Sequence, residues 1–206
     1  MGKIGSRVMH YAIATLIGRE LGFQNDAFVL GNLAPDAHQL SSSQLKKHSH
    51  FMKNDAEGIS YVDHRAFYQK YLAVEKEPFH LGYYVHLVSD SIWLEDVYFK
   101  KIKWLPAEIK QEAKRQYYRD FVRLNGMLID YYPLELMELR GADHNEVHEI
   151  PVDNLLPLIG ELEGDFKNAA STKAEPLEVL DFEEVVRTIG KTVEICLPVL
   201  EKGLAV

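Results

Sequence analysis

The sequence predicts an all-α protein that folds as one compact domain over residues 1–206. Apolar residues recur at helical spacing through nearly every segment of the chain. Alternating strand-like runs bounded by turn signals are not found. With 206 residues, of which 47% are hydrophobic, the chain is long enough to bury one substantial core.

Capping residues and prolines divide the first half of the chain into helices. The first helix is expected over 7–20, and the second begins at Asn25 or Asp26 and ends before Pro35. Asp36 is therefore expected in a loop. A short helix is expected over 45–51, and another begins at its N-cap, residue 63. A longer helix opens with Pro78 and continues past residue 96.

The second half of the chain shows the same signals. Helices are expected over 106–130, 133–140, 153–166 and 181–202, and the last opens with Asp181 and Glu184 as a capping box. Residues 167–176 are expected to form a surface loop. Cys196 is the one cysteine, which agrees with a reducing compartment, and we expect it to pack in the core.

Charge and hydropathy exclude several classes of partner. The formal net charge of -8 argues against duplex nucleic acid, because each phosphate contact needs a lysine or arginine. No run of about 18 apolar residues occurs, so no membrane-spanning helix is expected. Nothing resembles a secretory signal. These observations favour a cytoplasmic protein.

The histidines are concentrated in the first part of the chain, where seven of nine precede residue 87. His86 and Asp90 are four residues apart on a helix whose same face is otherwise mostly apolar. A carboxylate on such a face needs a hydrogen-bonded ion pair or a metal ion, and this pair alone is compatible with either. On the same helix, Gly82 would let another helix approach closely.

A second helix repeats this pattern, because His10 shares an apolar stripe with Ile13 and Ile17. The polar segments that carry Asp36 and His50 lie between the two helices. Imidazole nitrogen and carboxylate oxygen are the ligands that zinc and related divalent ions accept, and aspartates in the set favour a catalytic over a structural site. The sequence therefore predicts a metal site within residues 10–96.

Four sequence motifs occur in a fixed order: the helix with His10, segment 31–36 (GNLAPD), segment 49–51 (SHF) and segment 81–90 (LGYYVHLVSD). This set resembles the zinc-dependent phospholipases C and the related fungal single-strand nucleases, from about residue 10 to residue 93. The resemblance implies a compact helical fold in which a cluster of zinc ions hydrolyses phosphodiester bonds.

The resemblance also implies a role for each ligand. Asp36, His50 and His86 would hold a first metal, Asp90 would bridge it to a second, and His10 would bind the second. The expected cofactor is Zn²⁺ or another divalent transition metal, as one or two ions.

Some ligand positions of that family are replaced in this chain. Six residues after the bridging aspartate the family has a histidine, and this chain has Asp96. His38, His80 and Asp96 are candidates to replace missing ligands or to hydrogen-bond the ligands that remain. His48 is the alternative to His50.

The expected activity is metal-dependent hydrolysis of a small phosphate ester or phosphodiester. Asp36 would orient or deprotonate the attacking water, and Asp90 would hold the ions in place. The alternative is a non-catalytic metal-binding or regulatory helical protein that keeps only part of the site.

Overall fold

Helices make up most of the molecule. The computed structural model describes residues 5–40, 43–140 and 147–204, with backbone alone for 38–40, 43–45 and 204. The chain is 72% helix and 3% strand, which confirms the predicted all-α class. None of the helices within these ranges is both long enough and apolar enough to cross a membrane.

The elements follow one another in two groups. The first half of the chain forms α1 (Arg7–Glu20), α2 (Asp26–Leu33), the 3-10 helix η1 (Ala34–Leu40), α3 (Ser43–Ser49), β1 (Met52–Asn54), β2 (Ser60–Val62), α4 (His64–Phe67), the π-helical η2 (Tyr68–Leu72), α5 (Pro78–Trp93) and the π-helical η3 (Leu94–Lys103). The second half forms α6 (Ala107–Tyr131), the 3-10 helix η4 (Val152–Asn154), α7 (Leu155–Thr172) and α8 (Phe182–Leu204).

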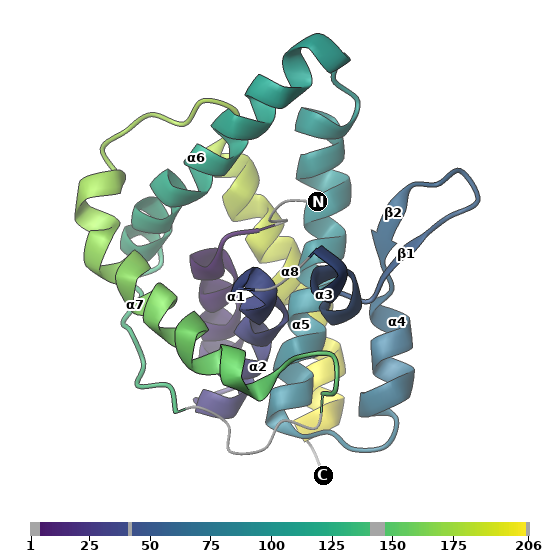
Figure 1. The fold of residues 1–206 in the computed structure, drawn as a ribbon. Helices are drawn as coiled ribbons and strands as arrows, with labels where there is room; N and C mark the ends of the chain where they lie inside the picture. The colour runs from purple at the N-terminus through teal and green to yellow at the C-terminus, as the bar shows by residue number, and fades with distance from the viewer. Residues whose placement is uncertain (1–4, 41–42, 141–146, 205–206) are drawn as a thin grey trace.

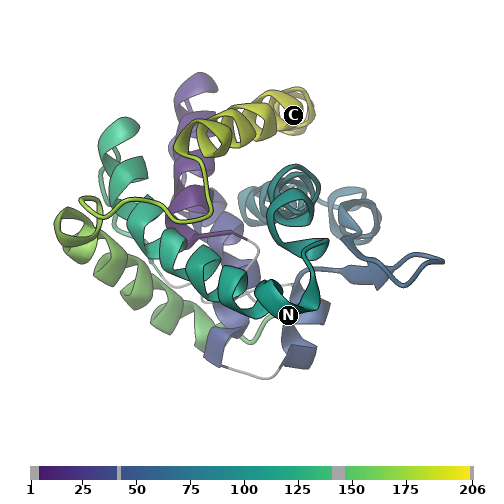
Figure 2. The same cartoon turned by 90° about the horizontal axis from the view of Figure 1, so that it is seen from above.

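Helix α5 lies in the middle of the fold and contacts α1, α2, α4 and α8 (Figure 1). Helices α6 and α7 run side by side on one side of the molecule, and the β1–β2 hairpin projects from the other (Figure 2). Ile13 of α1, Leu30 of α2 and Val85 of α5 are each at most 1% exposed. The hydrophobic core therefore lies where these three helices meet.

Side-chain caps fix several helix starts where the sequence predicts them. Ser6 accepts a hydrogen bond from the backbone of Met9, and Asn25 accepts one from residue 28. Asp63 caps α4 in the same way, and Asp181 accepts from the backbone N–H of Glu184 at 2.8 Å. Each cap satisfies a backbone donor that the first helical turn leaves unpaired.

Helices α2 and α5 cross with their backbones in contact. A Cβ atom on Gly82 would lie 2.0 Å from the carbonyl oxygen of Phe28, and one on Gly31 would lie 2.0 Å from that of Phe79. Only glycine allows so close an approach. The expectation that Gly82 lets another helix approach is confirmed, and the crossing brings the backbone of α2 against the polar face of α5.

Two predictions about loops were wrong, and one hairpin was missed. Asp36 lies in a 3-10 turn and not in a loop, and helix α7 continues to Thr172 through part of the expected 167–176 loop. The short antiparallel hairpin, in which Met52 pairs with Val62, was not predicted. The Asp55 carboxylate stabilises its turn by accepting two backbone hydrogen bonds.

Residues 134–140 form no helix, although one was predicted over 133–140. The Tyr11 hydroxyl donates to the carbonyl of Glu135 at 2.6 Å and accepts from the N–H of Met137 at 2.8 Å. A side chain of α1 thus takes backbone groups that a helix would use, and it holds the segment in an irregular conformation. In α8, Cys196 is 1% exposed, and burial raises the pKa of its thiol to about 12, as expected for a core residue.

Candidate metal centre

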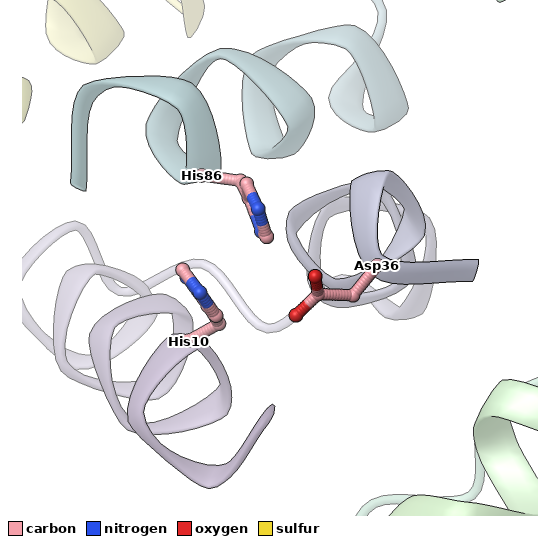
Figure 3. Close-up of side chains that lie close together, drawn as sticks. All are labelled: His10, Asp36 and His86. Atoms are coloured by element: carbon pink, nitrogen blue, oxygen red, sulfur yellow. The ribbon is translucent and has the colours of Figure 1, made fainter. Parts of the chain in front are cut away.

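The five side chains that the sequence predicts as ligands come together in the core. His10 lies on α1, Asp36 on η1, His50 directly after α3, and His86 and Asp90 on α5. Each is at most 3% exposed. Figure 3 shows His10, Asp36 and His86 approaching one another from three separate elements.

Donor atoms of three residues lie close to His50. His50 Nε2 lies 3.4 Å from His86 Nε2, 3.4 Å from Asp90 Oδ2 and 3.5 Å from Asp36 Oδ1. His86 Nε2 lies 3.6 Å from Asp90 Oδ2. Ligand atoms at a zinc–nitrogen distance of about 2.0–2.1 Å in tetrahedral geometry lie roughly 3.3–3.4 Å apart. The spacing among His50, His86 and Asp90 therefore fits a single divalent ion that these three residues would hold.

Backbone carbonyls set the orientation of two imidazoles. His86 Nδ1 donates to the carbonyl oxygen of Asn32 at 2.7 Å, and His50 Nδ1 to that of Lys46 at 3.1 Å. A carbonyl oxygen can only accept, so the proton of each neutral ring lies on Nδ1 and the Nε2 lone pair faces the cluster. When both rings are neutral, their two lone pairs face each other across 3.4 Å and repel unless a cation lies between them.

His10 and Asp90 form the second part of the cluster. His10 Nε2 lies 3.4 Å from Asp90 Oδ1, and the His10 ring stacks on His86 with centroids 3.8 Å apart. Ser89 Oγ contacts His10 Nδ1 at 3.0 Å. In the part of the chain that the structure describes, neither Asp90 oxygen nor His10 Nε2 has a hydrogen-bond partner. A buried carboxylate in this state is costly without a cation.

The pKa values place the donors in the form that binds metal. Burial lowers the pKa of His10 to about 3 and that of His50 to about 4, so both rings are neutral near pH 7. Burial tends to raise the pKa of Asp36, but the His50 contact and nearby positive charge bring it well below the usual range. The pKa of Asp90 is also lowered, because the charge of His86 outweighs burial.

His86 differs from the other two histidines. Burial tends to lower its pKa, but the negative charges of Asp90 and Asp36 outweigh this effect and raise it. Without a bound ion, a proton on His86 is therefore the cation that the carboxylates attract. A metal ion bound at the same point would replace this proton.

Three other candidate residues, His48, His80 and Asp96, are not among the grouped ligand atoms of the described residues. His48 is exposed, so His50 and not His48 faces Asp36. His80 is buried against the ring of Tyr71, with centroids 5.3 Å apart. Asp96 forms ion pairs with lysines 191 and 100 at 2.5 and 3.6 Å. These contacts do not support the prediction that His80 and Asp96 replace missing ligands or hydrogen-bond the ligands that remain. The side chain of His38 lies outside the described residues.

Sequence reasoning missed the residues that orient the ligands. Ser49 Oγ lies 2.9 Å from His50 Nδ1, and the same hydroxyl donates to the carbonyl of Pro35 at 2.9 Å. Asn32 and Lys46 act through their backbone carbonyls, and no sequence pattern marks that of Asn32. Lys46 precedes His50 by four residues on a helix, and that spacing is the signal that could have identified it.

The geometry thus groups the possible ligands in two sets that share His86: His50, His86 and Asp90 form one, and His10, Asp36 and His86 form the other. Because Nδ1 of His86 donates to the Asn32 carbonyl, only its Nε2 is available to a metal. His86 can therefore bind an ion at one position only. Comparison of the chain with protein-family models, with curated proteins and with solved structures finds no match.

Proposed function

We propose that this protein is a metal-dependent hydrolase of a phosphate ester or phosphodiester, with its ion held by Asp36, His50, His86 and Asp90. The observation that carries the proposal is the close approach of the His86 imidazole and the Asp36 and Asp90 carboxylates to His50 Nε2 in the core. The ordered sequence motifs that contain these four residues resemble those of the zinc-dependent phospholipases C. This resemblance supports the helical fold of that family and zinc as the metal.

The chemistry follows from the donor set. A divalent ion bound there supplies Lewis acidity toward a phosphoryl oxygen and lowers the pKa of a bound water. Asp36 is ionised at neutral pH, so its carboxylate can orient the attacking water and accept a proton from it. Asp90 fixes the distance between the two metal positions, since its two oxygens face different histidines.

Burial restricts the substrate. The five side chains are between 0% and 3% exposed, so a phosphate group reaches them only when covering segments move apart. The backbone of Gly5 is one such cover, because a Cβ atom placed there would lie 2.9 Å from His10 Nε2. We therefore propose a small phosphate ester as substrate rather than a polymer.

The same burial favours a second candidate function, a non-catalytic metal-binding protein. Structural metal sites are closed, whereas catalytic sites keep an open position for water or substrate. The two functions differ in what a metal-loaded protein does, because only the hydrolase releases product.

One screen separates them. Protein loaded with zinc, manganese or nickel is assayed on small phosphomonoesters and phosphodiesters, beside an Asp36→Asn variant. The hydrolase proposal expects metal-dependent turnover that falls at least 100-fold in Asp36→Asn. Full metal content without turnover on any of these substrates would favour the non-catalytic function.

A further inference from the structure

The connection between η3 and α6 forms a tip at one end of the molecule (Figure 1). We call residues 100–115 the η3–α6 tip. Trp104, the C-cap residue of η3, is 63% exposed, and Ile109 in the first turn of α6 is 53% exposed. The other tryptophan of the chain, Trp93, is fully buried. Two large apolar side chains that the core does not use are thus exposed five positions apart.

The η3–α6 tip is basic, although the chain as a whole is acidic. It contains six basic and two acidic residues, which gives it a net charge of +4 in a chain whose net charge is -8. Of the two acidic residues, Glu112 forms an ion pair with Arg115 inside the tip. Two of the five lysines pair with Asp96 and Glu184. The other three form no ion pair with any residue that the structure describes: Lys103, Lys110 and Lys114.

The Trp104 ring lies at the surface beside a cation. Its centroid is 6.1 Å from that of the Phe99 ring, and Lys103 Nζ lies 5.6 Å from it. An indole has an apolar body and one N–H donor, so it prefers the boundary between water and hydrocarbon. Lysine has a long apolar stem with a charge at its end, and it can reach phosphate groups at such a boundary. The tip therefore combines the two kinds of side chain that bind a lipid surface.

We propose that the η3–α6 tip binds an anionic lipid surface. Trp104 and Ile109 enter the boundary between headgroups and acyl chains, and the three lysines without ion pairs contact the headgroup phosphates. A protein partner fits this surface less well, because lysine is depleted in protein interfaces. This binding site goes beyond the proposed function and contains none of the five side chains of the metal centre. It would hold the protein on a membrane without crossing it.

The experiment is vesicle binding by the full-length chain, measured by co-sedimentation and by tryptophan fluorescence. One set of vesicles is phosphatidylcholine alone, and the other adds an equal share of phosphatidylserine. Because Trp93 is buried, a shift of the emission to shorter wavelength on binding reports on Trp104. We expect this shift with the phosphatidylserine vesicles, weakening with added salt, and no measurable binding to phosphatidylcholine alone.

The apolar part of the tip is tested by Trp104→Ala. Its matched control is Leu156→Ala in α7, which removes another apolar side chain that is 67% exposed. We expect the affinity for phosphatidylserine vesicles to fall by roughly tenfold or more in Trp104→Ala and to stay unchanged in Leu156→Ala.

The basic part is tested by the double variant Lys103→Gln/Lys110→Gln. Its matched control is Lys47→Gln/Lys167→Gln, which removes the same charge at two exposed lysines outside the tip. We expect the tip variant to lose roughly tenfold or more in vesicle affinity, and the control to lose about twofold at most.

Three results would overturn this inference. They are a wild-type chain that does not bind phosphatidylserine vesicles, an equal loss in the double lysine variant and its control, and tighter binding to a single-stranded oligonucleotide than to the vesicles. Each of these leaves the proposed function standing. In the opposite case, a chain that binds vesicles equally well with and without chelator supports the tip whatever the metal centre does.

Discussion

Two buried carboxylates, Asp90 on α5 and Asp120 on α6, are satisfied in different ways. Asp120 is 0% exposed and accepts hydrogen bonds of 2.8–3.1 Å from the backbone N–H groups of residues 178–180, with Arg123 at 3.1 Å beside them. Asp90 is 1% exposed, and its oxygens face only imidazole nitrogens at 3.4–3.6 Å.

This difference separates a structural carboxylate from one in a binding site. The segment before α8 supplies Asp120 with donors, so its negative charge is stabilised within the folded chain. Asp90 lies among groups that are themselves lone-pair donors once they are neutral. Both residues are buried, so burial does not distinguish them. They differ in whether the neighbouring groups point hydrogen-bond donors or lone pairs at the carboxylate.

The largest expected loss of stability comes from replacing Asp120. Asp120→Ala leaves the backbone N–H groups of residues 178–180 without their acceptor and removes one of the three carboxylates that Arg123 contacts. We expect it to lower the free energy of unfolding by about 3–5 kcal/mol. Urea denaturation measures this loss. Zinc content should stay at the wild-type value in protein that remains folded, and a loss of zinc at unchanged stability would remove the contrast between the two carboxylates.

The ligand arrangement around Asp90 depends on the contact between helices α2 and α5. Gly82→Ala would place a Cβ atom 2.0 Å from the Phe28 carbonyl and 2.8 Å from the Asn32 nitrogen, so the helices must separate. We expect a loss of roughly 3 kcal/mol in stability, with weaker zinc binding because the Asn32 carbonyl moves away from His86.

The matched control for this variant is Gly190→Ala in α8, where a Cβ atom meets nothing within 4 Å. Alanine has the higher helix propensity, so this change should leave stability equal or higher by up to about 1 kcal/mol. Equal stability of the two variants in thermal or urea unfolding would contradict the close packing of α2 on α5.

Proton uptake should affect the metal-free centre. The pKa values of His10 and His50 lie at about 3 and about 4 in the folded chain, below the ordinary value of 6.5. The unfolded chain therefore binds more protons below pH 6.5, and stability is lost as the pH falls from there toward 4. With chelator present, we expect the free energy of unfolding to decrease by about 1–2 kcal/mol per pH unit between pH 6 and 5. A flat profile in urea titrations over this range would contradict neutral buried imidazoles.

The smallest expected effect concerns the backbone that covers His10. Gly5→Ala would place a Cβ atom 2.9 Å from His10 Nε2 and 2.4 Å from Met9 Cε. The Met9 side chain can move, but the His10 ring is held by Ser89 and by stacking on His86. We expect zinc affinity to fall about tenfold, a change of roughly 1.4 kcal/mol, in competition titrations with a chromophoric chelator. Unchanged affinity would show that Gly5 does not constrain the second position.

The helix starts could be predicted from the sequence because caps act locally. Ser6 and Asn25 contact backbone groups only three residues away, so the signal and the structure lie in the same segment. The hairpin at 52–62 could not be predicted, because each strand has only three residues and neither shows a clear alternation of apolar and polar residues. Residues 133–140 carry a helical pattern, and a hydroxyl 124 residues away in sequence overrides it.

The ligands could be predicted because histidine and aspartate on apolar faces are themselves unusual. The groups that orient them could not, since the Asn32 carbonyl reaches His86 only through the α2–α5 crossing. The sequence marks Asp90 through His86 four residues before it, but nothing in the sequence shows how Asp120 is satisfied. Their difference arises from residues 178–180, which lie 58–60 positions away in the chain.

The most direct test is the metal content of the wild-type chain and of Asp90→Asn, measured by elemental analysis after purification without chelator or histidine tag and incubation with zinc. We predict at least one zinc ion per wild-type chain and none in Asp90→Asn, because the variant lacks a carboxylate charge among the ligands. A wild-type chain that binds no zinc, or an Asp90→Asn chain that binds as much as the wild type, would contradict the assignment of this cluster as a metal centre.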